Sequence, residues 1–226
     1  MERFFDIIFS TIALIILSPF LILIIIVLKH TGEREVLFLQ YRVGKGGKLF
    51  KLIKFATMLK NSPNFSTGTI TMKDDKRILP VGKFLRKSKI NELPQLVNIL
   101  LGDMSLIGPR PLTKQTFNAY SLPTQNIITQ VRPGLSGLGS IVFRGEEEIM
   151  YAENANIGFY DTVIAPYKGQ LEEWFVFNKN VKLYFAAIFL TIWVVLFPKS
   201  QMPWRLIKDL PEPSEKLKSI LKYRVL

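Results

Sequence analysis

The side chains that could do chemistry in this sequence are carboxylates, lysines and arginines. The 226 residues contain no cysteine and a single histidine, His30. This composition excludes thiol catalysis, disulfides and thiolate metal sites, and it also excludes histidine-rich zinc sites and a serine-histidine triad. His30 follows an apolar run, where an imidazole at the level of lipid headgroups is the simpler role. A reaction must therefore rest on Asp, Glu, Lys and Arg, with a cation such as Mg²⁺ bound through oxygen atoms.

The first candidate is an acid next to a basic segment. Residues 90–101 predict a helix because their apolar side chains fall on one face. That face holds Leu93, Leu96, Val97 and Leu100, with Pro94 in the first turn and Gly102 just past the end. Asn91 and Glu92 then lie at the helix N-terminus, where the macrodipole stabilises an acid and free N-H groups can bind phosphate. Glu92 is the candidate for acid-base catalysis or metal binding. Its simpler role is that of an acid at a helix terminus that the helix dipole stabilises. Asn91 has an alternative role as a helix N-cap.

Two later turns extend this candidate site. Residues 103–111 form a tight, proline-fixed loop around Arg110, and rigid turn chemistry of this kind suits a phosphate clamp. Asp103 opens the loop and is either a metal ligand or a cap after the glycine turn. The remaining phosphate-binding candidates are Lys54, Arg86, Lys87 and Arg132, the last in a second glycine-rich turn. Glu146 to Glu148 is most simply a solvated acidic face, because adjacent positions on a helix point in different directions.

A short hairpin precedes these residues in the chain. Residues 35–43 and 49–55 alternate roughly between apolar and polar, and the glycine-rich turn 44–48 between them predicts a β-hairpin. The turn resembles a phosphate loop only superficially, since it lacks the G-x-x-x-x-G-K-[ST] spacing and leads into a strand.

Positive charge is concentrated between Lys29 and Lys89. The chain has 30 Lys and Arg against 18 Asp and Glu, a net charge of +12, and this segment alone holds a surplus of 11. Within it, residues 61–71 predict a surface loop and residues 82–89 a short basic helix with Phe84 and Leu85 facing inward. Such a patch beside a membrane segment suits anionic headgroups, a cytoplasmic location, and anionic substrates such as nucleotide diphosphates or lipid phosphates. Nucleic acid is disfavoured, because no binding motif accompanies the charge.

A hydrophobic run from Ile7 to Leu28 indicates a membrane segment. Its 22 residues could cross a bilayer core of about 30 Å, but Ser18 and Pro19 interrupt it, and a mid-helix proline kinks or breaks a helix. A hairpin that dips into the membrane and returns is therefore as consistent with the run as a span. No small-residue cleavage site follows, so we expect a permanent anchor instead of a signal peptide.

Two amphipathic segments lie near the C-terminus. The apolar stretch 181–197 is short for a span and holds Tyr184 and Trp193, residues typical of membrane interfaces, so we expect it to lie in the membrane surface. The tail, residues 200–226, contains a predicted helix capped by Ser214.

Together these motifs resemble the bacterial sugar transferases, the monotopic polyprenyl-phosphate phosphoglycosyl transferases that start cell-surface glycans such as exopolysaccharide and lipopolysaccharide. The resemblance covers roughly residues 1–197. Its motifs, in order, are the membrane helix broken at Ser18 and Pro19, Gln40 to Gly44, Lys54 to Met58, Glu92 to Leu96, Asn98, Gly102 to Ser105, Gly108 to Pro111 and Arg132 to Gly134. Several motifs in the right order make chance similarity improbable.

The resemblance implies transfer of a phosphosugar from a nucleotide diphosphate sugar, usually a UDP-sugar, to a polyprenyl phosphate such as undecaprenyl phosphate. UMP is released and Mg²⁺ assists. Family members use an Asp-Glu dyad, in which the Asp attacks the sugar-bearing phosphorus before the lipid phosphate takes the phosphosugar, a covalent ping-pong scheme. The resemblance also implies that the broken helix is re-entrant, with both ends on the cytoplasmic side of the bacterial inner membrane.

The chain departs from the family pattern at two positions. Asn91 stands where the nucleophilic Asp is expected, and Ala56 stands where the family commonly has Arg. Three explanations compete: Glu92 acts as nucleophile or as base in direct transfer, Asp103 substitutes if its loop folds back, or the chain is a catalytically inactive membrane scaffold that binds nucleotide sugar or lipid phosphate. We favour a transferase, because Glu92 and Arg110 are retained.

The sequence thus predicts an α/β, helix-rich cytoplasmic domain with a small β-hairpin, anchored by a re-entrant N-terminal helix and by interfacial helices. Its expected parts are residues 1–30, the re-entrant helix; residues 31–199, the phosphoglycosyl transferase domain with the interfacial helix at 181–197; and residues 200–226, the amphipathic tail. The expected partners are a UDP-sugar, polyprenyl phosphate and membrane lipids, with Mg²⁺ at Glu92 and Asp103. A homodimer on the membrane is a hypothesis that the basic face and interfacial tail motivate. A two-span structural membrane protein would instead place the N-terminus and the globular part on opposite faces.

Overall fold

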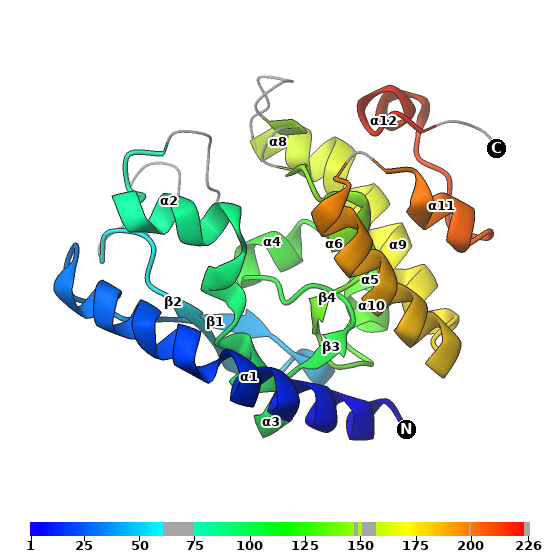
Figure 1. The fold of residues 1–226 in the computed structure, drawn as a ribbon. Helices are drawn as coiled ribbons and strands as arrows, with labels where there is room; N and C mark the ends of the chain where they lie inside the picture. Colours follow the sequence, from blue (N-terminus) through cyan, green and yellow to red (C-terminus); the bar gives the residue numbers. More distant parts are fainter. Residues whose placement is uncertain (61–74, 147–148, 151–156, 199, 224–226) are drawn as a thin grey trace.

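The computed structural model describes residues 1–60, 75–146, 149–150, 157–198 and 200–223, and it shows a helix-rich molecule with two small sheets (Figure 1). The elements of the first half are α1 (Glu2–His30), β1 (Leu37–Val43), the 3₁₀ turn η1 (Lys45–Gly47), β2 (Leu49–Phe55), α2 (Pro80–Lys87), the 3₁₀ turn η3 (Ile90–Glu92), α3 (Gln95–Leu101) and β3 (Ser105–Ile107). The second half contains α4 (Lys114–Asn118), α5 (Leu122–Ile128), β4 (Gly134–Ser136), α6 (Leu138–Val142), α8 (Ile157–Phe159), the π-helical η4 (Tyr160–Ile164), α9 (Ala165–Phe177), α10 (Val181–Leu196), α11 (Met202–Leu206) and α12 (Glu215–Ile220). The predicted helix-rich architecture with a small hairpin is confirmed.

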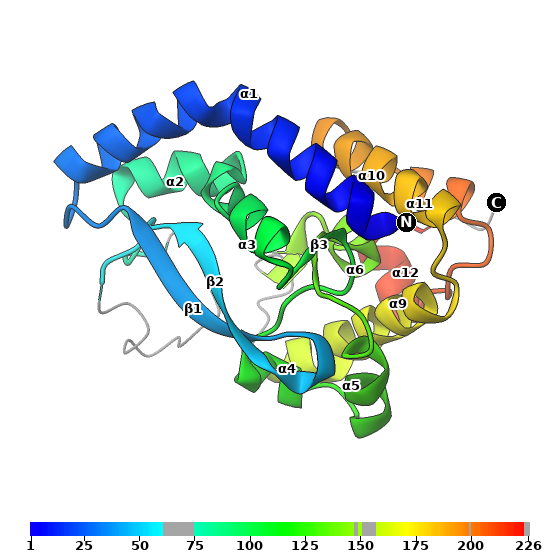
Figure 2. The same cartoon turned by 90° about the horizontal axis from the view of Figure 1, so that it is seen from below.

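Helix α1 is continuous and lies along the globular part instead of projecting from it (Figure 2). Its most apolar stretch has a mean hydropathy of 3.1 and is 11% buried, so the helix is long and apolar enough to cross a membrane. Pro19 lies inside it and cannot donate to the carbonyl of Ile15. The hydroxyl of Ser18 donates to that carbonyl at 2.8 Å, which compensates for the missing backbone bond.

Both ends of α1 are attached to the globular part. Near its start, Asp6 is 1% exposed. The carboxylate Oδ1 of Asp6 accepts hydrogen bonds from Ser105 Oγ at 3.0 Å, Leu106 N at 2.9 Å and Tyr184 Oη at 2.9 Å. Near its end, Ile24 and Leu28 form a core cluster with Phe55 and Leu85. The two ends of the helix therefore contact one and the same body.

The predicted hairpin is present and α3 holds it. β1 and β2 pair antiparallel, with Leu37 opposite Phe55 and Val43 opposite Leu49. Asn98 of α3 is 1% exposed and bridges to the edge of β2: its Oδ1 accepts from Ile53 N at 3.0 Å and its Nδ2 donates to Lys51 O at 2.8 Å. Because one amide satisfies both a donor and an acceptor of the strand, it fixes the strand relative to the helix.

The two glycine-proline turns pack against each other. β3 and β4 pair in parallel, with Ser105 opposite Gly134, and Gly108 N donates to Ser136 O at 2.9 Å. A Cβ atom at Gly134 would lie 2.1 Å from the backbone nitrogen of Gly108. Only glycine permits this approach, so the loop 108–111 owes its position to the turn 132–134.

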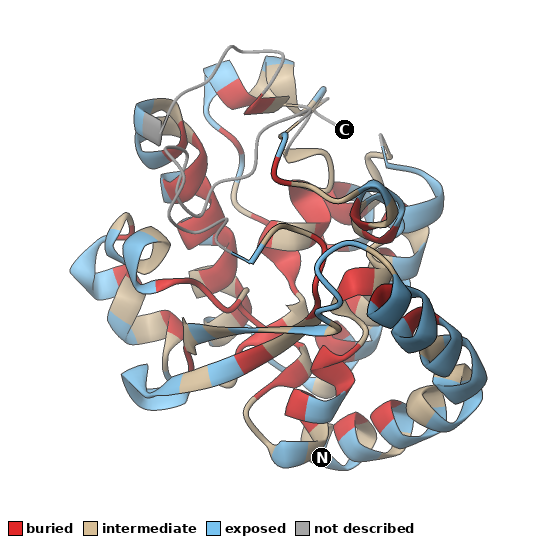
Figure 3. Ribbon diagram, turned by 90° about the vertical axis from the view of Figure 1, so that its left-hand side faces the viewer, coloured by how far each residue is buried: buried red, intermediate tan, exposed pale blue. Residues whose placement is uncertain are grey.

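The main hydrophobic core lies among α6, α9 and α10, and it includes the C-terminal region. Figure 3 shows buried residues gathered inside the molecule, whereas the helix that starts at the N-terminus is largely exposed. Leu217 of α12 is 1% exposed, and Trp204 and Leu210 belong to the same core cluster. The segment 200–223 is thus anchored to the core of the domain by its buried apolar side chains. Ser214 precedes α12, but its side chain makes no capping hydrogen bond.

Two predictions of side-chain packing are wrong. Leu85 faces inward, but Phe84 is 63% exposed. Val97 is 38% exposed, and Asn98 and Ile99 are buried in its place. The reason for the second error is that α3 begins only after Pro94, and the preceding turn is a tighter 3₁₀ turn that changes which face points inward. The predicted loop 61–71 lies outside the described residues.

Candidate active site

A cluster of opposite charges joins three separate parts of the chain. Oε1 of Glu92 accepts a hydrogen bond from Lys54 Nζ at 2.9 Å and another from Arg110 Nη2 at 3.1 Å. The side chains of Glu92 and Lys54 are 14% and 17% exposed, and that of Arg110 is 35% exposed. Three sequence-predicted residues therefore meet, and the cluster opens to solvent at the arginine.

Each of the three side chains is positioned by a local feature of the fold. Lys54 of β2 pairs with Phe38 of β1, and Phe38 and Arg42 share a face because alternate residues of a strand point to the same side. Lys54 and Arg42 therefore lie on the same face of the hairpin. Glu92 follows Lys89, whose backbone adopts the left-handed conformation (φ 60°) and redirects the chain after α2. The Arg110 loop is held by β1, since Arg42 Nη1 donates to Pro111 O at 3.2 Å.

The charges in the cluster shift one another's ionisation. Burial alone would raise the pKa of Glu92, but Lys54 and Arg110 outweigh it and hold that pKa well below its usual value. Burial lowers the pKa of Lys54 to about 8, because the attraction of Glu92 offsets only part of the desolvation. The charge of Glu92 raises the pKa of Arg110. At neutral pH all three groups are therefore charged, and the lysine is the one closest to losing its proton.

Further cations surround this cluster. Burial and the charge of Arg110 lower the pKa of Arg42 to about 10, and burial lowers the pKa of Arg144. Both arginines interact electrostatically with the charge of Glu92, and so does Lys89. The Nε of Arg42 is buried without a partner among the described residues. One carboxylate thus faces several positive groups, an arrangement that suits a multiply charged anion such as a diphosphate.

Asn91 lies next to Glu92 in the turn η3 and is 6% exposed. Its Oδ1 is buried and has no hydrogen-bond partner within the described part of the chain. The N-cap interpretation is wrong, because Pro94 occupies the N-cap of α3 and no side chain caps the helix there. Adjacent residues of a 3₁₀ turn point in different directions, so the ligand suited to Mg²⁺ is the Glu92 carboxylate, because Mg²⁺ takes one or two carboxylates together with substrate phosphates. Among the described residues, no group of three or more His, Cys, Asp or Glu gathers as a metal site.

A second buried network lies behind the Arg110 loop, on α9. Glu172 is 2% exposed, its Oε1 accepts from Arg110 N at 3.5 Å, and its Oε2 has no partner among the described residues. Burial raises the pKa of Glu172 to about 7. Lys168, 2% exposed, pairs with Glu146 at 2.8 Å. Glu146 is therefore a structural partner and not a solvated acid, while residues 147 and 148 lie outside the described residues.

Four predicted site residues are placed elsewhere. Asp103 lies at the far end of α3 from Glu92, about 10 Å along a helix of this length, and its Oδ2 accepts from Asn98 Nδ2 at 3.2 Å. Arg132 Nε donates to Gly102 O at 2.8 Å, also at that far end. The charge of Arg86 interacts with the carboxylate of Asp75, and Lys87 is exposed on α2. One ion could not touch both Glu92 and Asp103 at this separation.

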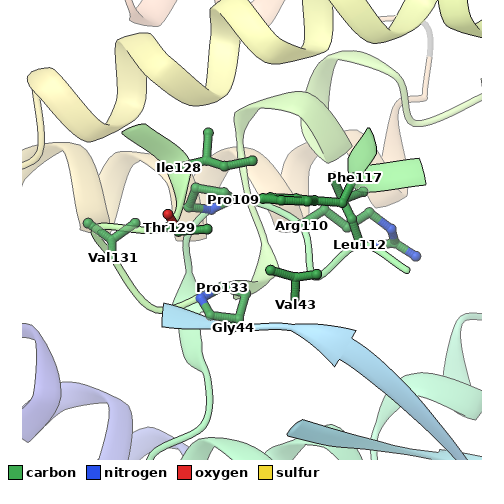
Figure 4. Close-up of a pocket in the computed structure, with 10 residues that line it drawn as sticks. All are labelled: Val43, Gly44, Pro109, Arg110, Leu112, Phe117, Ile128, Thr129, Val131 and Pro133. Carbon is green, nitrogen blue, oxygen red and sulfur yellow. The ribbon is translucent and has the colours of Figure 1, made fainter. Parts of the chain in front are cut away.

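A small pocket on the inner side of the loop is too small to hold a substrate. Its lining includes Val43, Pro109, Ile128 and Pro133, and the guanidinium group of Arg110 points away from their side chains (Figure 4). With a volume of about 10 Å³, the pocket could hold at most a single water molecule. It is a packing gap beneath the loop, and the chemistry lies on the guanidinium side.

Some residues of the candidate site were not predicted from sequence. Arg42 could have been found, because the alternation of the hairpin places Gln40 and Arg42 on the face that carries Lys54. Lys89 also had a local signal, because it lies three residues before Glu92. Arg144 and Glu172 gave no such signal, since each reaches the site through the tertiary fold.

Comparisons with known proteins are consistent with this geometry. The model of a family described as bacterial sugar transferase matches residues 1–198. The chain is 34% identical to the exopolysaccharide production protein ExoY of Sinorhizobium fredii, over 67% of this chain and 72% of that protein. It is 35% identical to UDP-N-acetylgalactosamine-undecaprenyl-phosphate N-acetylgalactosaminephosphotransferase of Aeromonas hydrophila, over 86% of this chain and 43% of that protein. It is 38% identical to UDP-glucose:undecaprenyl-phosphate glucose-1-phosphate transferase of Klebsiella pneumoniae, over 66% of this chain and 32% of that protein. The chain thus spans less than half the length of the last two.

Proposed function

Since the chain belongs to the bacterial sugar transferase family, we propose that it transfers a phosphosugar from a UDP-sugar to a polyprenyl phosphate such as undecaprenyl phosphate and releases UMP. The observation that carries this proposal is the meeting of Lys54, Glu92 and Arg110 in one partly open cluster. Phosphoryl transfer depends mainly on positioning and on neutralising phosphate charge, and a surplus of fixed cations supplies both. Two relatives, the Aeromonas and Klebsiella proteins, carry a UDP-sugar and undecaprenyl phosphate in their names.

We propose direct transfer in place of the aspartyl intermediate. An oxygen of the lipid phosphate attacks the sugar-bearing phosphorus, a new P-O bond forms, and the P-O bond to UMP breaks. The attacking phosphate is already anionic at neutral pH, so no base is needed. Arg110 and Lys54 would bind the diphosphate oxygens and stabilise the charge that develops on UMP as it leaves.

The state of Glu92 supports this choice. A carboxylate whose pKa is held well below its usual value, with one oxygen bound by two cations, is a weak base and a weakened nucleophile. The amide of Asn91 cannot take over the role of an aspartate. We therefore assign Glu92 to orienting Lys54 and Arg110. Mg²⁺ would be held by Glu92 together with the diphosphate, and it would supply further charge neutralisation.

Release of UMP with and without the acceptor lipid tests this mechanism. The chain as given should release UMP only when polyprenyl phosphate is present, whereas Asn91→Asp should release a stoichiometric burst before the acceptor is added. Glu92→Gln should lower turnover on the order of 10²- to 10³-fold, and Glu35→Gln, a change of the same type at an exposed carboxylate, should leave it unchanged.

Other outcomes separate the alternatives. A burst from the chain as given, abolished in Glu92→Gln, would show that Glu92 forms a covalent intermediate and would refute direct transfer. No release from any form, with UDP-sugar binding intact, would support the inactive scaffold.

We also propose that α1 is re-entrant and that the globular part lies on the cytoplasmic face of the bacterial inner membrane. The two ends of α1 contact the same body, through Asp6 at the start and Leu28 at the end, and these contacts support a placement of both ends on one side of the bilayer. The exposed apolar face of α10 adjoins it, since the rings of Phe5 and Phe185 lie 5.0 Å apart. Together the two helices would form the membrane-facing surface.

The absence of cysteine allows a direct topology test. Single cysteines replacing Phe4, His30 and Lys83, all exposed, should resist a membrane-impermeant maleimide in intact cells and react together once the inner membrane is opened. If the cysteine at position 4 alone reacted from outside, α1 would span the membrane and the re-entrant proposal would be wrong.

A further inference from the structure

A second polar cavity lies apart from the proposed active site. It has a volume of about 200 Å³ and is bounded by the first turn of α1, the tip of the hairpin, the start of β3 and the turn before β4. At about 30 Å³ per molecule it has room for several waters or for a phosphate group. It is thus a cavity that a small anionic group could enter.

The charges around this cavity are unbalanced. Four cationic side chains line it: Arg3, Lys45, Arg132 and Lys179. Its two acids already have partners, because Glu2 pairs with Lys179 at 2.7 Å and Asp6 accepts three hydrogen bonds from the protein. Arg3 donates to the carbonyls of the last turn of α3, and Arg132 donates only its Nε within the described contacts. The outer edge of Arg132 and the exposed ammonium of Lys45 therefore present positive charge to the cavity.

The location of the cavity distinguishes it from the active site. Arg3 contacts Leu100 at the C-terminal end of α3, whereas Glu92 precedes the N-terminal end, so about 10 Å of helix separates the two. The cavity is also lined by the polar start of α1, and exposed apolar residues such as Phe4 and Ile7 follow directly. If α1 enters the membrane as proposed above, this polar start lies at the level of the lipid headgroups.

We propose that this cavity binds the headgroup phosphate of an anionic phospholipid of the membrane. The inference rests on the proposed membrane placement of α1. Arg132 would offer a planar pair of donors to the phosphate and Lys45 a point charge, the two usual modes of phosphate recognition. The bound lipid would link the hairpin, α1 and the turn before β4, and would set the depth of the globular part on the membrane.

Lipid titration of the full chain in neutral detergent, followed by native mass spectrometry, tests the inference. Short-chain phosphatidylglycerol should bind more tightly than phosphatidylcholine, and Lys45→Gln should weaken phosphatidylglycerol binding about fivefold. Lys48→Gln is the matched control, because Lys48 is exposed on the same turn but does not line the cavity, and its affinity should match that of the unchanged chain. Arg132→Lys, which keeps the charge and loses the paired donors, provides a second variant and should also weaken binding.

Two outcomes would overturn the inference. Equal affinities for Lys45→Gln and Lys48→Gln would show that only overall charge matters, and loss of the phosphatidylglycerol preference in excess inorganic phosphate or polyprenyl phosphate would identify a different ligand. UMP release by the same preparations keeps this result separate from the proposed function: the Lys45→Gln form should still turn over when its lipid affinity has fallen. Equal phosphatidylglycerol affinities of the Lys45→Gln and Lys48→Gln forms, with UMP release intact, would reject the lipid site and leave the proposed function standing.

Discussion

The buried carboxyl of Glu172 makes the stability of this protein depend on pH. Its pKa is raised from the ordinary value of 4.5 to about 7, because burial disfavours the charged form. The unfolded chain therefore binds fewer protons than the folded chain between these two values, and stability must fall as pH rises through them. At about 1.4 kcal/mol per pH unit, the ionised group costs roughly 3 kcal/mol at about pH 8 and less than about 1 kcal/mol at about pH 5.

Replacing Glu172 by Gln removes this cost without changing the shape of the side chain. The amide oxygen can still accept from Arg110 N, and the amide nitrogen takes the place of Oε2, which has no partner among the described residues. A protonated Glu172 also leaves a donor there, so the two forms should be about equally stable at about pH 5. At about pH 8 the Gln form should be more stable by roughly 2 to 3 kcal/mol, which corresponds to a rise in melting temperature of about 4 to 12 °C for a chain of this size.

Thermal unfolding of the purified chain in detergent at the two pH values measures this difference. Glu173→Gln, the neighbouring and partly exposed acid, is the control and should shift the melting temperature little at either pH. A Glu172→Gln form that is equally or less stable at the higher pH would refute the reasoning, because it would mean that the native carboxylate is compensated by a partner.

Three further predictions follow from contacts elsewhere in the fold. Gly134→Ala should destabilise the chain by several kcal/mol or prevent folding, since its Cβ would lie 2.1 Å from a backbone nitrogen. Gly46→Ala, with open space and φ of +66°, should lower the free energy of unfolding by only about 1 kcal/mol, and thermal unfolding of the two variants measures the difference. Asp6→Ala should leave three donors unpaired and loosen α1, which limited proteolysis near the N-terminus would detect, and unchanged protection would contradict the role given to Asp6. The affinity for UDP-sugar should fall above about pH 8, where Lys54 loses its charge, and Lys54→Arg should abolish that fall in a binding titration; the same pH profile in both forms would exclude Lys54 as the titrating group.

The sequence was sufficient to predict the local elements and the three residues that meet at the centre of the candidate site. Alternation and a glycine-rich turn indicated the hairpin, and an acid at the start of an apolar segment indicated Glu92. These features succeed because they depend on neighbours within a few residues. The wrong inward face of residues 90–101 has a local cause as well, namely the 3₁₀ turn before Pro94.

The residues that the sequence could not assign are those whose role depends on distant contacts. Asp103 and Arg132 looked like ligands of an active site, but they lie at the far end of α3, where they hold Asn98 and Gly102 in place. Glu172 looked like an ordinary helix residue, although it lies 2% exposed behind the Arg110 loop. No pattern of spacing distinguishes a buried acid on a helix from an exposed one when the helix is apolar on most sides.

The charge balance around Glu92 connects the missing aspartate to the proposed mechanism. With Asn at position 91, a single carboxylate faces Lys54 and Arg110 directly, with Arg42 and Arg144 nearby. An aspartate there would neutralise part of that surplus and compete with the diphosphate for the same cations. Under the proposed mechanism the amide would leave the surplus to the substrate phosphates and strengthen binding of two anions at once, as a direct reaction between a nucleotide sugar and a lipid phosphate requires. In the proposed mechanism the loss of the nucleophile and the excess of positive charge are thus two aspects of one arrangement, and this mechanism predicts tight joint binding of both proposed substrates by the chain as given.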